Sequence, residues 1–206
     1  MDLKPDSENS MELATITRPI VDNHFQTPIP KITNVVAKFS TGIELKLDYI
    51  IAKVNGAEYN PARFSGCILK LVSPKITSMI FNTGIILITG ARSEESCYLG
   101  ARRLIRMLTL INLPVKLVNF KYINIVAQVN LKFPIRLEGI VDSNAQRINY
   151  EPELFPAVFY RIFSPKMTFL IFVNGQIIIT GAKSKSQLIK AFNNVYPVLR
   201  QFRKMK

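Results

Sequence analysis

The chain has 206 residues, with 27 Lys and Arg against 14 Asp and Glu, two Cys and one His. This length suits one medium domain or two small ones, and 48% hydrophobic residues can form a core, which excludes wholesale disorder. No apolar run approaches the roughly 20 residues of a membrane span, and two cysteines are too few for a disulfide framework or a Cys-rich metal site. A reducing compartment is therefore expected. The net charge of +13 either serves only solubility or indicates a polyanionic partner: DNA, RNA or an anionic membrane surface.

Residues 1–30 are predicted to form a flexible N-terminal tail. The segment has four prolines and no sustained hydrophobic period, and the four acids among its first 12 residues oppose the charge of the remaining chain. An acidic start without an apolar stretch is not the pattern of a signal peptide.

An internal repeat organises the rest of the chain. Residues 59–93 match residues 150–184 at a constant offset of 91, with 16 of 35 positions identical, and Asn34 matches Asn124 at an offset of 90. Two copies are too few, and the period is too long, for a solenoid. We therefore expect two units, residues 31–120 and 121–206, related by a pseudo-twofold axis.

Each unit is predicted to mix strands and helices. In chain order, a strand, a short helix, three strands and a long helix are expected, and the second unit repeats this order. The expected strands are 34–39, 67–72, 77–81 and 85–89, with counterparts at 124–129, 158–163, 168–172 and 176–180; the expected helices are 45–53 and 94–110, with counterparts at 135–141 and 185–202.

Local signals place the boundaries of these elements. Gly84 and Gly175 carry hairpin-turn chemistry between the last two strands of each unit. Ser93 and Ser184 are expected to be the N-caps of the long helices. Pro197 lies inside the last helix and predicts a kink or a break there.

Several predicted strands are apolar at consecutive positions, such as 85–88 and 177–179. Because side chains alternate between the two faces of a strand, both faces of the sheet are apolar there. One long and one short helix per unit can cover only one face, so the other is expected to be an apolar binding surface rimmed by basic residues. Two alternatives stay open: the chain closes this face internally, or a homodimer covers it.

The most specific signals are short motifs in the two units. The first unit contains AEYNPARF at 57–64, and the second contains KFPIRLEG at 132–139, YEPELFP at 150–156, LIFVNG at 170–175 and TGAK at 180–183. In register over about residues 30–204, and more strongly in the second unit, they closely resemble the conserved core of the TATA-binding protein family.

The resemblance implies an α+β saddle of two pseudo-symmetric repeats. A curved antiparallel β-sheet of about ten strands would carry four helices on its convex face, and its concave face would bind the minor groove of A·T-rich promoter DNA. The implied DNA-intercalating residues are Phe64, Phe81, Phe155 and Phe172; the base and groove contacts are Asn34, Val36, Leu87, Thr89, Asn124, Val126, Ile178 and Thr180; the phosphate contacts are Lys70, Arg92, Arg161 and Lys183.

These residue types suit the chemistry of that groove. Both orientations of an A·T pair offer the acceptors A N3 and T O2, whereas G·C adds an amino donor that an apolar floor leaves unsatisfied. A few Asn and Thr groups can read the acceptors near the dyad. A phenyl ring is flat and apolar, so it can replace a lost base-stacking contact.

The chain also departs from the family pattern. Ile85 and Gln176 follow the hairpin glycines where the family usually has Lys, and Val72 and Ser164 stand at usually basic positions. Lys38 and Gln128 replace smaller hydroxyl residues. Two alternative consequences are expected: the chain makes fewer phosphate contacts, or it has a looser preference for DNA sequence.

Partner surfaces are implied by the same resemblance. Glu151, Glu153 and Leu154 match the stirrup loop that engages transcription factor IIB, and transcription factor IIA is a second expected partner. The basic convex surface, with Arg102, Arg103 and Arg106 on the first long helix, is expected to meet acidic regulators. A weak homodimer off DNA and a nuclear location complete the expected context.

An enzyme finds no support in the sequence. There is no Gly-rich phosphate loop, His24 lies alone in the tail, and neither Cys67 nor Cys97 has a histidine nearby in the sequence. No cofactor or metal is expected. We interpret the chain as a general transcription initiation factor that bends A·T-rich promoter DNA and nucleates preinitiation complex assembly. Three alternatives are a paralogue with altered DNA preference, a saddle that binds other proteins, and an accessory domain of a nucleic-acid enzyme.

Overall fold

The computed structural model of the protein describes residues 27–143 and 148–204. The predicted tail falls mostly on residues 1–26, which lie outside the described residues. Among the described residues, no helix is long and apolar enough to cross a membrane.

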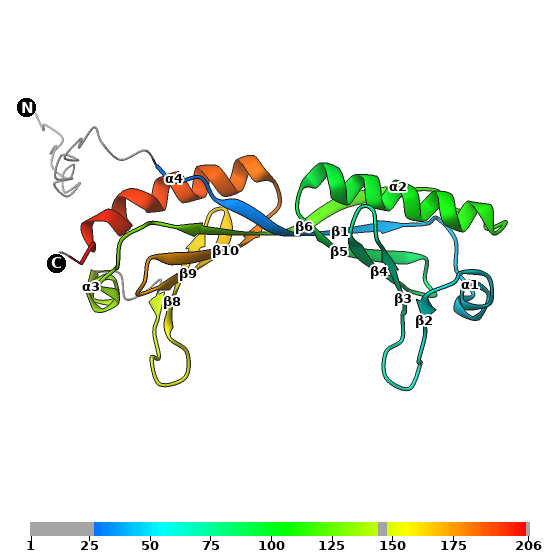
Figure 1. Ribbon diagram of the computed structural model, residues 1–206, viewed down its shortest axis with the longest axis horizontal. Coiled ribbons are helices and arrows are strands. Elements are labelled where there is room, and N and C mark those ends of the chain that lie inside the picture. Colours follow the sequence, from blue (N-terminus) through cyan, green and yellow to red (C-terminus); the bar gives the residue numbers. More distant parts are fainter. Residues whose placement is uncertain (1–26, 144–147, 205–206) are drawn as a thin grey trace, which may run out of the picture.

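The described chain forms one ten-stranded antiparallel sheet with four helices, as the resemblance implies (Figure 1). The strands follow the spatial order β2-β3-β4-β5-β1-β6-β10-β9-β8-β7, so the two first strands, β1 and β6, pair at the centre. The elements of the first unit are β1 Lys31–Ser40, α1 Leu47–Lys53, β2 Ala57–Glu58, β3 Cys67–Leu71, β4 Ile76–Ile80, β5 Ile85–Ala91 and α2 Glu94–Leu110. The second unit repeats them as β6 Val118–Asn130, α3 Leu137–Ser143, β7 Ile148–Asn149, β8 Ala157–Phe163, β9 Lys166–Phe172, β10 Gln176–Ala182 and α4 Lys185–Gln201.

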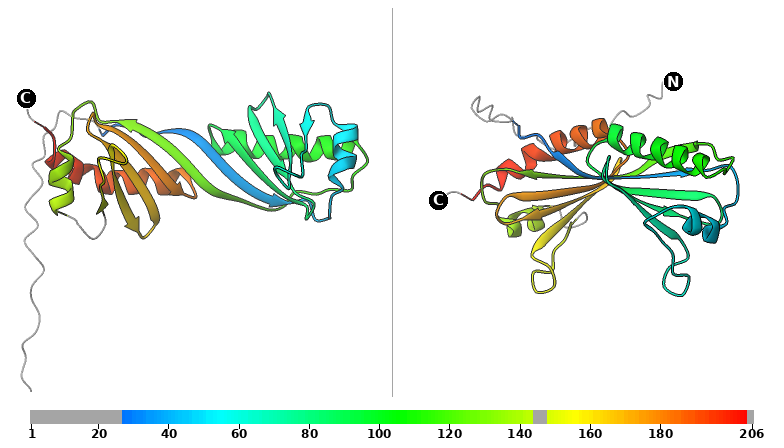
Figure 2. Two further views of the ribbon diagram at one scale, coloured as in Figure 1. Left: turned by 90° about the horizontal axis from the view of Figure 1, so that it is seen from below. Right: turned by 45° about the vertical axis from the view of Figure 1, so that its right-hand side comes forward.

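The long helices α2 and α4 lie on the convex face of the curved sheet (Figures 1 and 2). Side chains that point toward them are buried, including Ile76 and Ile80 on β4 and Phe169 and Ile171 on β9. The side chains that alternate with them along each strand, such as Thr77, Met79 and Leu170, are only partly covered, and no described segment lies over them. For the described residues, internal closure of the second face is therefore wrong.

The short helices begin two residues later than predicted, at Leu47 and Leu137. The preceding backbone is held by the hairpin turns, because the N–H of Leu45 donates to the carbonyl oxygen of Asn82 at 2.8 Å and that of Ile135 to Val173 at 2.9 Å. Because these amide groups are bonded to a neighbouring turn, the residues just before each short helix stay outside it.

Of the kink or break predicted at Pro197, the break is wrong, because α4 runs through it to Gln201. The missing N–H removes one intrahelical bond, but Tyr196 and Leu199 on either side are buried in the core. Tertiary packing therefore keeps the last turn in place, as it does for many marginal helix sequences.

The predicted caps and turns are confirmed. The N–H of Ser96 donates to Ser93 Oγ at 3.1 Å, and that of Gln187 donates to Ser184 Oγ at 3.2 Å. Gly84 and Gly175 have φ of 75° and 84°, and a side chain at either would collide with a backbone carbonyl oxygen, that of Ile43 or of Phe133. These two positions therefore require glycine on both conformational and steric grounds.

Candidate nucleic-acid interface

The face of the sheet opposite α2 and α4 is open and concave, and we call it the concave face (Figure 2). None of the described side chains that point to it is buried, and nine of the twenty are apolar. They come from eight strands: Asn34, Val36, Lys38, Ile68, Lys70, Thr77, Met79, Ile85, Leu87 and Thr89 in the first unit, and Asn124, Val126, Gln128, Phe159, Arg161, Thr168, Leu170, Gln176, Ile178 and Thr180 in the second.

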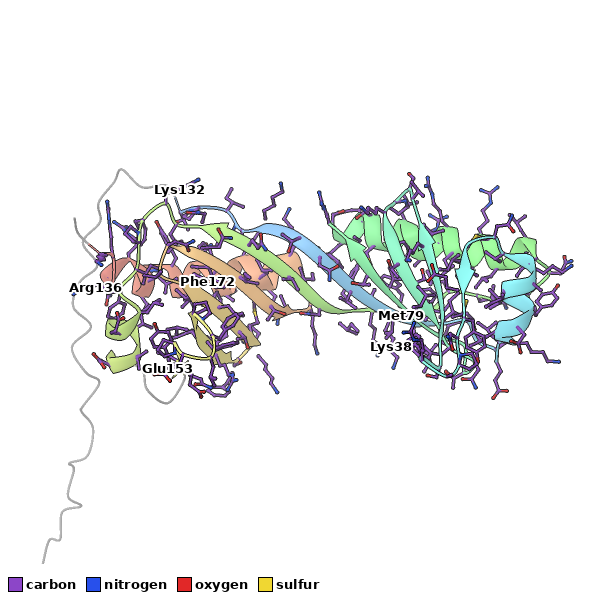
Figure 3. All side chains as sticks on the ribbon, turned by 60° about the horizontal axis from the view of Figure 1, so that its bottom comes forward. Lys38, Met79, Lys132, Arg136, Glu153 and Phe172 are labelled. Atoms are coloured by element: carbon purple, nitrogen blue, oxygen red, sulfur yellow. The ribbon has the colours of Figure 1, made fainter. Side chains whose placement is uncertain are left out.

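Cross-strand pairing arranges part of this face into two equivalent rows. In the first unit, Ile68 pairs with Met79, Met79 with Leu87, and Leu87 with Lys38. In the second unit, the corresponding row is Phe159, Leu170, Ile178 and Gln128. Each row is an apolar floor that ends on a polar side chain of a central strand, and Figure 3 labels Met79 and Lys38 of the first row.

A pair of phenylalanine rings lies beside the outer end of each row. The centroids of Phe64 and Phe81 are 5.7 Å apart, and those of Phe155 and Phe172 are 6.0 Å apart, both in edge-to-face geometry. Phe64 and Phe155 are 36% and 38% exposed. Phenylalanine side chains are more often fully buried in the core. The structure thus brings together the two residues of each predicted pair.

The exposed ring of each pair is held by a short loop, the stirrup, that hangs below the sheet (Figure 1). The stirrups are residues 59–66 and 150–156. The N–H of Phe64 donates to Asn60 and that of Phe155 to Glu151, both at 2.9 Å, which closes one helical turn. This turn fixes the backbone from which the ring projects. Leu154, at the tip of the second stirrup, is 80% exposed.

The two predicted asparagines lie at the centre, in the same local arrangement. The side-chain oxygen of Asn34 accepts from Gly90 N–H at 2.7 Å and from the Thr89 hydroxyl at 3.2 Å. Asn124 accepts from Gly181 at 2.8 Å and from Thr180 at 3.2 Å. With each Oδ1 engaged by two donors, the Nδ2 amino group is the free end of the amide, with no hydrogen bond to a described residue.

The four predicted phosphate contacts are all exposed, but they differ in their partners. Lys70 Nζ lies 3.2 Å from Glu58 Oε1, in an ion pair whose side chains are 64% and 65% exposed. Arg161, its counterpart, forms no ion pair with a described residue. Arg92 and Lys183 follow β5 and β10, the strands next to the central pair, so they lie where the long helices begin.

Sequence analysis missed two further lysines on this surface, Lys31 and Lys121. Lys31 pairs with Gln128 and Lys121 with Lys38, so each extends one of the two rows. β10 pairs with β6 only at Ile125 and beyond, which leaves Lys121 on a part of the strand with a single neighbour. The offset of 90 between the two lysines, the same as between Asn34 and Asn124, was the signal that could have revealed them.

On the convex side, the three predicted arginines of α2 are exposed but not equivalent. Arg103 donates to the carbonyl oxygen of Ser73 in the β3–β4 turn and lies 3.3 Å from Ser73 Oγ. Arg102 borders a hollow of about 490 Å³ lined also by Glu94, Glu95, Tyr98, Leu99 and Tyr122. Arg103 therefore ties the hairpin to the helix, whereas Arg102 and Arg106 face outward.

Two groups that line this hollow have pKa values shifted by burial or by hydrogen bonds. The Tyr122 hydroxyl donates to the backbone oxygen of Glu94 at 3.0 Å, and burial raises its pKa to about 12. Hydrogen bonds from its own backbone N–H and from Ser93 lower the pKa of Glu95. These are the shifts expected of a partly buried phenol and of a carboxylate in the first turn of a helix.

The two cysteines are free and buried. Burial raises the pKa of both thiols, that of Cys97 to about 11. A thiol in this state is a poor nucleophile. In the part of the chain that the structure describes, no group of three or more His, Cys, Asp or Glu could hold a metal ion.

Comparison with known proteins agrees with this geometry. The family model described as "Transcription factor TFIID (or TATA-binding protein, TBP)" matches residues 29–111 and again 119–202. The chain is 42% identical over 176 residues to the TATA-box-binding protein of Xenopus tropicalis and 43% identical over 176 residues to TATA box-binding protein-like 2 of Takifugu rubripes. These alignments cover 85% of this chain but only 59% and 55% of those proteins, so the chain spans less than two thirds of their length.

A solved structure shows the same fold. The structure of Methanococcus jannaschii TBP superposes with a TM-score of 0.74 at 30% identity, covering 84% of this chain and 99% of the other. The double match to one family model also explains the internal repeat as two copies of one unit. The chain belongs to the TATA-binding protein family.

Proposed function

We propose that this protein is a transcription initiation factor that binds the minor groove of A·T-rich promoter DNA on its concave face. The carrying observation is the twofold arrangement of that face: an apolar floor, two central asparagine amides and a ring pair at each outer end. The names of the relatives, which include "TATA-box-binding protein", support the same reading.

The asparagine amides would act as hydrogen-bond donors to the groove. Because Gly90 and Gly181 each hold an Oδ1 atom, the Nδ2 amino groups are the ends left for A N3 or T O2. The floor residues beside them, such as Val36 and Val126, offer no acceptor for a guanine amino group. A·T-rich sequences would therefore bind better than G·C-rich ones.

The phenylalanine pairs would bend the DNA. TATA-binding proteins and other minor-groove proteins insert apolar side chains between base steps and kink the duplex. Phe64 and Phe155 already project from closed stirrup turns, so little backbone freedom is lost on insertion.

Partner binding would use surfaces away from the groove. The second stirrup, with Glu151, Glu153 and Leu154 exposed, would contact transcription factor IIB, and transcription factor IIA would also join the complex on promoter DNA. Arg102 and Arg106 would receive acidic regulators, while Arg103 would have to give up its contact with Ser73 to do so. These roles place the protein in the nucleus, and none requires catalysis.

One experiment tests the DNA and partner proposals together. Glu151→Arg should leave affinity for an A·T-rich duplex nearly unchanged and weaken recruitment of transcription factor IIB in a gel-shift assay. Lys190→Arg, on the exposed surface of α4, is the control. Equal loss of both activities in folded Glu151→Arg would contradict separate surfaces, and no duplex binding by the unaltered protein would overturn the proposed function.

A second candidate function is a family paralogue with altered DNA preference. The observation that favours it is the asymmetry of the floor, where Ile85 of the first unit corresponds to Gln176 of the second, and Lys38 corresponds to Gln128. Duplex titrations that vary one half-site at a time would separate it from the first candidate, because a paralogue would tolerate changes that a strict A·T reader rejects.

A further inference from the structure

Lys38 and Lys121 form a like-charged pair across the two central strands. They are direct cross-strand partners in the β1–β6 ladder, and both are exposed. Neither forms an ion pair with a described residue. Like charges directly opposite each other destabilise an antiparallel pair, so the free protein gains nothing from this arrangement.

The burial of neighbouring residues shows that this lysine pair lies on the concave face of the sheet. Lys38 stands between Ala37 and Phe39, which are buried against the helices, so it points to the concave face. It pairs with Leu87 on one side and Lys121 on the other. The pair therefore lies where the apolar row of the first unit meets the edge of the concave face, and Figure 3 labels Lys38 there.

The other half of the saddle, which carries β7–β10, has no such pair. At the equivalent place Gln128 of β6 pairs with Lys31 of β1, so two positive charges in one half correspond to one in the other. The backbone arrangement is the same in both halves, with Leu87 beside Lys38 and Ile178 beside Gln128. The two halves therefore differ here by one side-chain charge, while their backbone pairing is the same.

We propose that Lys38 and Lys121 together form a DNA phosphate-binding site present only in the half of the saddle that carries β2–β5, so that this half engages one more phosphate than the other. The proposal rests on the proposed binding of DNA by the concave face. An ammonium group is a strong point-charge donor to phosphate, and a bound phosphate would neutralise the repulsion that the free protein carries. The two halves of a bound site would then differ in their dependence on salt.

The test is a salt series on single and exchanged variants, with binding measured on matched A·T-rich and G·C-rich duplexes. For one lost phosphate contact, Lys38→Gln should lower the slope of log affinity against log salt by about 0.9. Gln128→Lys should raise it by about the same amount, and the double variant Lys38→Gln/Gln128→Lys should restore the original slope. Lys190→Gln, an exposed lysine on α4, is the matched control for loss of charge elsewhere.

A second readout separates a binding role from a structural one. Because the pair is repulsive, Lys38→Gln should raise the urea midpoint of the free protein at low salt, and this gain should disappear at high salt. Weaker DNA binding together with a more stable free protein is the signature of a charge kept for a ligand.

Three results would overturn the proposal. The slope could remain unchanged in Lys38→Gln, it could fall as much in Lys190→Gln, or the loss could be confined to A·T-rich duplexes, which would assign Lys38 to base reading. Binding by the unaltered protein combined with any of these outcomes refutes the lysine pair alone. No binding by the unaltered protein refutes both proposals.

Discussion

The side-chain oxygen of Asn34 lies 2.7 Å from the backbone nitrogen of Gly90, and this contact decides which end of the amide faces the concave surface. An Asp at this position could keep the bond from Gly90 but would place a carboxylate oxygen where the amino group stood. Asn34→Asp should therefore fold normally and lose more affinity for A·T-rich DNA than Asn34→Ala, which should cost about 1–3 kcal/mol. The salt slope of Asn34→Ala should change little. Similar affinities for both variants would argue against the amide as a donor.

The stirrup glycine limits the ring pair of the first unit. A Cβ at Gly66 would lie 2.7 Å from Phe64 Cε1 and 3.1 Å from Phe81 Cε1, whereas the second unit has Ala157 at the equivalent position. Gly66→Ala should displace the exposed Phe64 ring and reduce DNA bending in a fluorescence-transfer assay, with little change in thermal stability. Ala157→Gly is the reciprocal variant and should leave bending close to its original value. An unchanged bend in Gly66→Ala would show that the ring position is unimportant.

The ion pair between Lys70 and Glu58 should compete with phosphate binding. Glu58→Gln frees the lysine and should strengthen duplex binding at low salt, while stability should change by less than about 1 kcal/mol because the pair is exposed. The second unit supplies the opposite test, since Asn149 stands at the position equivalent to Glu58. Asn149→Glu should weaken binding through a new pair with Arg161. Binding that is equally strong in both variants would exclude this competition.

The buried thiols give a test of the core. Cys67 and Cys97 should react with a thiol reagent at pH 8 only after denaturation, because their pKa values are raised, that of Cys97 to about 11. The linkage between proton binding and folding gives the direction in which stability changes at higher pH. A raised folded-state pKa contributes stability below the unfolded value of 9.0, and that contribution is lost as pH rises toward 11. Rapid labelling of the folded protein would contradict the packing of α2 on the sheet.

Much of the fold followed from the repeat and from local signals. The glycine turns and the serine caps could be placed because each depends on residues close in sequence or on a match between the two units, and the Phe64–Phe81 pair was implied by the family resemblance. The length of β6 could not be predicted in this way. Pairing with β1 extends the strand beyond its own apolar run, to a total of 13 residues.

The orientation of some side chains also depends on irregular pairing. A register shift between Val36 and Ala37 interrupts the alternation along β6. Strict alternation from Asn124 would put Tyr122 on the concave face, yet its hydroxyl bonds to Glu94 on the helix side. The same shift brings Lys121 beside Lys38, which is why sequence analysis missed it. Likewise, the bond from Gly90 to Asn34 joins residues 56 positions apart, and no local pattern predicts it.

The most direct test of the account is the bend of a doubly labelled duplex in the presence of the protein. Energy transfer between the duplex ends should rise on an A·T-rich site, stay near baseline on a G·C-rich site of equal length, and fall in Phe155→Ala and in Phe172→Ala. Phe163→Ala, which removes an exposed ring at the end of β8, is the control and should leave the bend unchanged. Equal transfer on both duplexes, or an unchanged bend and affinity in both ring-pair variants, would contradict the assignment of the concave face as a minor-groove surface with phenylalanine wedges.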